Sequence, residues 1–63
     1  MRNAFTIDLS TGNAAFDDGN ARDEVARILR EIATRLEEGA TSGKAFDING
    51  NRVGSWKLER EEA

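Results

Sequence analysis

The chain has 63 residues and a formal net charge of −3, and it contains neither cysteine nor histidine. A chain of this length forms one small domain, which we expect to span residues 1–63 and to bury only about 60% of its unfolded surface. The missing residue types exclude disulfides and the usual zinc ligand sets. The acidic balance disfavours nonspecific nucleic-acid binding, and no apolar run approaches the roughly 20 residues that span a bilayer. We therefore expect a soluble cytoplasmic protein without a cofactor.

The first predicted element is a strand at residues 4–9. Phe5, Ile7 and Leu9 alternate there with smaller or polar residues, which is typical of a strand with one buried face. Turn-forming residues end this strand at positions 10–13. Phe16 lies in the connection that follows, and we expect its side chain to pack beneath the following helix.

The second predicted element is a helix over residues 21–38. Its apolar residues recur every three or four positions and form one stripe; they are Val25, Ile28, Leu29, Ile32 and Leu36. Asn20 is a suitable N-cap residue, and Gly39 stands where a left-handed residue commonly ends a helix. The stripe predicts that this helix lies on a sheet.

The remaining elements form a β-hairpin over residues 41–58. Asp47 suits the first position of a type I turn, and Gly50 suits the left-handed position after it. This turn has a three-residue loop, which pairs Asp47 with Asn51. A two-residue turn at Asn49 and Gly50 is the alternative.

Strand parity decides between the two turns. Successive side chains of a strand point to opposite faces, so one extra loop residue moves a whole strand's side chains to the other face. The three-residue loop places Phe46, Trp56 and Leu58 on one face, where they build a core. We therefore predict the bulged hairpin. Gly54, within the second strand of the hairpin, suggests a further bulge or room for a large neighbour.

These elements predict an α+β fold of order β-α-β-β, with a three-stranded antiparallel sheet and one helix on one face. We place the third strand in the centre because it carries the largest apolar residues; a parallel pairing of strands one and two is the alternative. Residues 59–63 are predicted to be a frayed tail, and Ile48 to close one end of the core. The predicted core consists of Phe5, Ile7, Leu9, Phe16, Val25, Ile28, Leu29, Ile32, Leu36, Phe46, Trp56 and Leu58.

The opposite face of the sheet is predicted to be open to solvent. It should carry six small, polar or charged residues, namely Thr6, Asp8, Ala45, Val53, Ser55 and Lys57. A flat, mixed face of this kind is a candidate surface for binding another protein. The candidate interaction residues are Thr6, Asp8, Val53, Ser55 and Lys57.

No residue pattern indicates catalysis or metal binding. Without histidine or cysteine, a nucleophilic serine would need a lysine as its base, and Ser55 and Lys57 are expected on a solvated face. The segment from Asp47 resembles the start of a calcium-binding loop. However, Gly50 is fourth in it rather than sixth, and Leu58 stands where that loop needs a glutamate. We assign no catalytic, cofactor-binding or metal-binding residues.

Four segments resemble small proteins encoded in tailed phages and prophages, most of them of unknown function. These segments are NAAF (13–16), EVARILR (24–30), RLEEGATSG (35–43) and DINGNRVG (47–54), and together they cover most of the chain. The resemblance carries no catalytic residues. It implies a short accessory gene product made inside a bacterial cell, of a kind that often inhibits host enzymes or host defence systems, as anti-CRISPR proteins do.

We therefore expect a noncatalytic module that binds another protein, as an inhibitor of a host defence system in the bacterial cytoplasm. The alternative is a nucleic-acid-binding accessory protein that uses the helix arginines, although the acids between them favour a solvated helix face; these arginines are Arg22, Arg27, Arg30 and Arg35. An engineered scaffold without function is a further alternative, against which the irregular connection at 13–20 argues. The open edge of the first strand also predicts a homodimer, formed through that edge or through the open sheet face around Val53 and Ser55.

Overall fold

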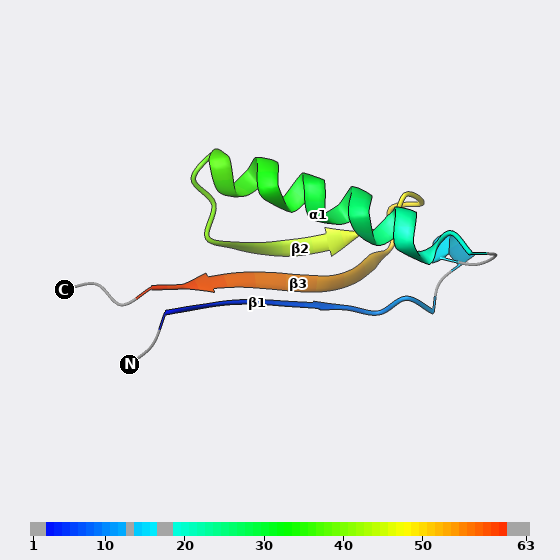
Figure 1. The fold of residues 1–63 in the computed structure, drawn as a ribbon, viewed down its shortest axis with the longest axis horizontal. Coiled ribbons are helices and arrows are strands. Elements are labelled where there is room, and N and C mark those ends of the chain that lie inside the picture. The colour runs from blue at the N-terminus through cyan, green and yellow to red at the C-terminus, as the bar shows by residue number, and fades with distance from the viewer. Residues whose placement is uncertain (1–2, 13, 17–18, 61–63) are drawn as a thin grey trace.

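The computed structural model describes residues 3–12, 14–16 and 19–60. These residues form three strands, one α-helix and one short 3-10 helix: β1 (Ala4–Leu9), η1 (Ala14–Phe16), α1 (Ala21–Glu37), β2 (Ser42–Phe46) and β3 (Arg52–Glu59). The strands make an antiparallel sheet in the order β1-β3-β2, and α1 packs against β2 and η1 (Figure 1). The α+β fold with a central third strand is confirmed, and the parallel alternative is wrong.

The ends of α1 and β3 differ in part from prediction. Asn20 occupies the N-cap position of α1, but its side chain makes no capping hydrogen bond. At the other end, Gly39 has the expected left-handed conformation, with φ of 107°. The strand β3 continues to Glu59, because its pairing with Ala4 on β1 holds that residue in the sheet, so Glu59 is not part of a tail. Residues 61–63 of the predicted tail lie outside the described part of the chain.

The hairpin turn has the predicted register. The Asp47 N–H donates to the Asn51 carbonyl oxygen over 2.9 Å, and the Gly50 N–H donates to the Asp47 carbonyl oxygen over 3.0 Å. Gly50 has φ of 86°, a conformation that glycine adopts at little cost. The three-residue loop is therefore confirmed.

A second bulge, at Val53, reverses the faces that the sequence predicts for this hairpin. Phe46 pairs with Arg52 but Ala45 pairs with Gly54, so Val53 is an extra residue in β3. Because of this extra residue, each β2 side chain lies on the other face of the sheet than predicted, relative to the part of β3 that follows Val53. Phe46, a predicted core residue, is consequently 41% exposed, whereas Ala45 and Val53, predicted on the open face, are buried.

The core lies between α1 and the β2–β3 half of the sheet. Its buried apolar side chains are Phe16, Ile28, Ile32, Ala45, Val53 and Trp56. Trp56 lies over Gly43, the residue opposite it on β2, where a Cβ atom would stand only 2.9 Å from the indole Nε1. The glycine thus leaves the room that the indole occupies.

The strand β1 lies at the margin of this core. Figure 1 shows β1 on the side of the sheet away from α1, which runs beside β2. Ile7 and Leu9 are half-buried against the core, but Phe5 and Leu29, both predicted core residues, are 44% and 43% exposed. An apolar stripe predicts which side of an element is buried, whereas the breadth of sheet that one helix covers depends on tertiary packing.

Candidate interaction surfaces

The tip of the β2–β3 hairpin is held by a buried carboxylate. Asp47 is buried, and its Oδ1 accepts hydrogen bonds from the backbone N–H groups of Asn49 and Asn51 over 2.9 and 2.8 Å. Its Oδ2 accepts a further bond from the Asn51 side chain. An aspartate at the start of a turn commonly bonds the backbone two residues on. The loop from 48 to 50 is therefore fixed from within.

A second buried carboxylate ties this loop to α1. Glu24 is 7% exposed, and its Oε2 accepts the Ile48 N–H over 2.8 Å. Arg27 donates to both carboxylate oxygens of Glu24 over 2.9 Å each, and also to the Phe46 carbonyl oxygen and to Glu31. Two-point arginine–carboxylate bonding of this kind has a defined geometry. The helix and the hairpin tip are thus linked through one ion pair.

Local sequence patterns do not predict this link. Acidic residues in the first turn of a helix are common because the helix dipole favours them, so Glu24 carries no distinctive signal. The only local indication is the spacing of three residues between Glu24 and Arg27, which places the two side chains on one helix face. Glu24 and Arg27 reach hairpin residues that lie 24 and 19 positions further along the chain, and this follows from tertiary packing.

Glu24 is held in its charged form. The hydrogen bond from Arg27 lowers the pKa of the Glu24 carboxyl below its ordinary value of 4.5; burial opposes this shift, and the bond from the Ile48 N–H adds to it. In return, Glu24 raises the pKa of the Arg27 guanidinium. The link between helix and hairpin therefore persists at neutral pH.

Acid should weaken this link. Because the pKa of Glu24 is lower in the folded chain than in the unfolded chain, its contribution to stability is complete above pH 4.5 and is lost as pH falls through the folded pKa. We expect Glu24→Gln to be less stable than the wild type at pH 7, with the difference shrinking below pH 4.5. Urea unfolding at several pH values measures both free energies.

Glu38→Gln provides the control for this titration. Glu38 is exposed beyond the other end of α1, so the substitution makes the same change in net charge away from the hairpin tip. Because a negative charge at the C-terminal end of a helix is not favoured by the helix dipole, Glu38→Gln should be no less stable than the wild type at pH 7. A constant difference between wild type and Glu24→Gln from pH 7 to pH 3 would contradict the assigned role.

Two large apolar side chains project at this fixed tip. Ile48 is 69% exposed and Phe46, two residues before it, is 41% exposed. The prediction that Ile48 closes one end of the core is wrong. Its backbone N–H donates to Glu24, but its side chain faces solvent. We call Phe46 and Ile48 the tip surface.

Four of the five predicted interaction residues form one exposed patch on the sheet. Thr6 pairs with Lys57 and Asp8 pairs with Ser55 across β1 and β3, and all four are exposed. We call these four residues the polar patch. Val53, the fifth, is 6% exposed. The bulge turns it into the core, so its predicted place on the open face is wrong.

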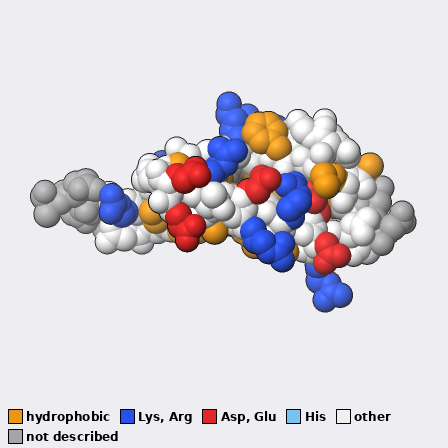
Figure 2. Space-filling view, turned by 90° about the horizontal axis from the view of Figure 1, so that it is seen from above, with side chains coloured by type: hydrophobic (Ala, Val, Ile, Leu, Met, Phe, Trp, Pro, Cys, Tyr) orange, Lys and Arg blue, Asp and Glu red, His pale blue; other side chains and the backbone are white. Residues whose placement is uncertain are grey.

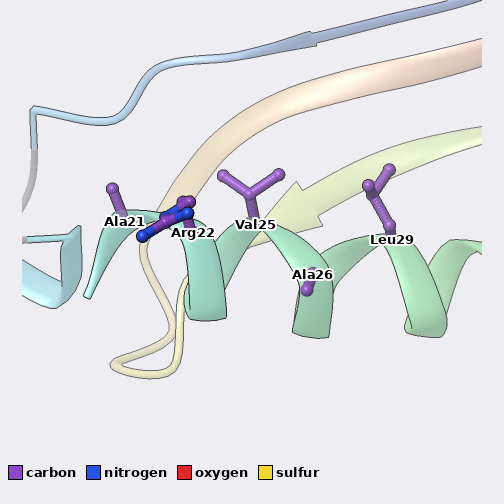
Figure 3. A pocket seen from close by; sticks show the side chains of 5 residues that line it. All are labelled: Ala21, Arg22, Val25, Ala26 and Leu29. Atoms are coloured by element: carbon purple, nitrogen blue, oxygen red, sulfur yellow. The ribbon is translucent and has the colours of Figure 1, made fainter. Parts of the chain in front are cut away.

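A groove with largely apolar walls runs along α1 on another side of the molecule. It is lined by Ala21, Arg22, Val25, Ala26 and Leu29. Figure 3 shows the side chains of Ala21, Val25 and Leu29 pointing to the same side of the helix, toward the strands. All five lining residues belong to α1, so the groove follows the surface of the helix.

Comparison with known proteins supplies no identity for this arrangement. No protein-family model matches the chain, and searches of curated proteins and of solved structures find no significant match. Within the described ranges, no three histidine, cysteine, aspartate or glutamate residues are grouped so that they could hold a metal ion. In the same ranges no helix has the length and apolar character needed to cross a membrane.

Proposed function

We propose that this chain is a noncatalytic module that binds another protein through the tip surface, with Ile48 as the main anchor. The observation that carries this proposal is the contrast between the backbone and the side chain of Ile48. The backbone N–H is bonded to a buried carboxylate, while the side chain is 69% exposed.

A fixed apolar anchor favours association because little conformational freedom remains to be lost on binding. Interface energy concentrates in a few apolar side chains surrounded by polar residues that exclude water. Phe46 is a second exposed large apolar side chain near this end of the hairpin, and Arg52 pairs with it across the hairpin. Ile48 also borders a hollow whose other lining residues are mostly polar or charged and would form the rim, namely Ala15, Asn20, Asp23, Glu24 and Arg27.

We further propose which kind of partner this module binds. The likeness to small phage-encoded proteins supports a partner in the bacterial host cell, whose defence activity this chain would inhibit from the host cytoplasm. That support rests on the kind of gene and not on a matched site. The contacts at the hairpin tip support protein binding as such.

The alternative, nucleic-acid binding by α1, has weaker support. Arg27 donates to two carboxylates and a carbonyl oxygen, so its charge is already paired. Figure 2 shows basic and acidic side chains interleaved on the face seen from above, without a continuous basic area. Phosphate binding favours clustered basic residues.

The proposal is tested by capture from a bacterial lysate on immobilised wild type, Ile48→Ser and Asn49→Ser. Asn49 is exposed in the same loop, so its variant is matched in position. We expect wild type and Asn49→Ser to retain the same protein, and Ile48→Ser to bind the purified partner at least about tenfold more weakly, as loss of one buried apolar side chain predicts.

Thermal unfolding accompanies this test, because Ile48→Ser must keep the melting temperature of the wild type for the comparison to hold. Retention of the same protein by Ile48→Ser with unchanged affinity would refute the anchor. Wild type that retains no protein in stoichiometric amount would refute the proposed function.

A further inference from the structure

Within the described part of the chain, the outer edge of β1 presents an ordered row of backbone groups that pair with no other strand. The Ser10 N–H donates to the Val53 carbonyl oxygen over 2.8 Å, which continues the register between β1 and β3. Hydrogen-bonding direction alternates along an antiparallel strand. Ala4, Thr6 and Asp8 therefore direct their backbone groups to β3, and Phe5, Ile7 and Leu9 direct theirs to the free edge.

This edge lacks the usual protection against pairing. Natural edge strands commonly carry proline, lysine, a bulge or inward-pointing charges. β1, with the sequence AFTIDL, contains neither proline nor lysine, and its one charged residue is Asp8. It pairs with β3 in unbroken register and therefore has no bulge there. Among the described residues only β3 pairs with it.

The edge is also complementary to itself. In an antiparallel pair of β1 strands related by a two-fold axis at Ile7, Phe5 of each copy lies opposite Leu9 of the other. All three outward-directed residues then form hydrogen-bonded pairs, with about six backbone bonds in total. A shift by two residues pairs Phe5 with Ile7 and leaves Leu9 without an apolar partner.

The two sheet faces agree with this register. On the helix side it aligns Phe5, which is 44% exposed, with apolar residues of the second copy. On the other face it sets the Thr6 hydroxyl opposite the Asp8 carboxylate, so no like charges lie opposite one another. A chain with so few buried apolar residues gains stability by covering this margin.

We propose that two copies of this chain associate through antiparallel β1 strands, with Ile7 on the two-fold axis, into one continuous sheet. Since the axis is perpendicular to the sheet, both α1 helices lie on the same face. The groove beside Leu29 in each copy then opens onto a shared trough whose floor is the paired β1 strands. This proposal does not depend on the tip surface, which lies on the hairpin.

Charge substitutions at Thr6 test the register. Thr6→Asp places a carboxylate opposite Asp8 of the second copy and should weaken the dimer about fivefold, because two symmetric pairs are affected; Thr6→Lys should strengthen it by a similar factor. Within one copy the effects are opposite in sign, since Thr6 pairs with Lys57. If the substitutions acted only within one copy, Thr6→Asp would therefore be more stable than Thr6→Lys, and it would not weaken the dimer.

Ser42→Asp and Ser42→Lys are matched controls, because Ser42 on β2 pairs with the same Lys57 from the other side. Sedimentation equilibrium from low to high micromolar concentration gives the dissociation constants. We expect a wild-type dimer, opposite shifts for the two Thr6 variants that shrink in high salt, and no shift for the Ser42 variants. A monomeric wild type, or Ser42 variants that shift association as much as the Thr6 variants do, would overturn the proposal.

Discussion

Gly54→Ala should destabilise the fold by about 3 kcal/mol, at the upper end of the usual cost of overpacking a well-packed site. A Cβ atom at this position would overlap the backbone carbonyl oxygen of Asp8 and stand 2.9 Å from Leu9 Cδ2. The oxygen belongs to the paired strand β1 and cannot move without breaking the sheet. Urea unfolding followed by tryptophan fluorescence measures the change, since Trp56 is buried in the same strand.

Gly12→Ala is the control for this effect. Among the described residues, no atom beyond Gly12 and its chain neighbours lies within 4 Å of the position that a Cβ would take, and the φ of Gly12 is not left-handed. Alanine there should leave stability unchanged or raise it slightly by restricting the unfolded chain. Equal stabilities for the two alanine variants would show that β1 and β3 do not approach as closely as described.

The bulge beside Gly54 is a feature that strand parity alone does not predict. The hairpin loop follows from the local chemistry of Asp47 and Gly50, and its register is confirmed by the bond between Asp47 and Asn51. The bulge at Val53 is a tertiary feature, although a glycine inside a strand gave a signal for it. One unpaired residue was enough to exchange the predicted positions of Phe46 and Ala45.

The candidate sites divide in the same way. The exposure of the polar patch follows from alternation along β1 and β3, which places Thr6 and Asp8 away from the helix. The tip surface and its support by Glu24 were not predictable, because a carboxylate near a helix start has many local explanations. The exposed Leu29 shows the same limit, since a helical stripe does not indicate how far the sheet beneath it extends.

Ile32→Ala and Trp56→Ala should each cost about 2–5 kcal/mol, the usual range for truncating a large buried side chain. Both residues belong to the cluster between α1 and the sheet and are 4% and 2% exposed. A domain of this size has a total stability of roughly 3–9 kcal/mol at typical values per residue. Each variant should therefore be largely unfolded at 37 °C or show a strongly lowered melting temperature by circular dichroism.

Leu29→Ala is the control for Ile32→Ala, because it makes a similar truncation in the same helix at an exposed position. Leu29 lies three residues before Ile32 in α1 but is 43% exposed, because its side chain borders the uncovered groove and not the core. Its truncation should cost less than about 1 kcal/mol, since alanine is the better helix former and little buried area is lost. If Leu29→Ala proved as destabilising as Ile32→Ala at a concentration where the chain is monomeric, α1 would have to cover β1 more fully than described. If the loss appeared only where dimers form, it would place Leu29 at the margin of the β1 interface.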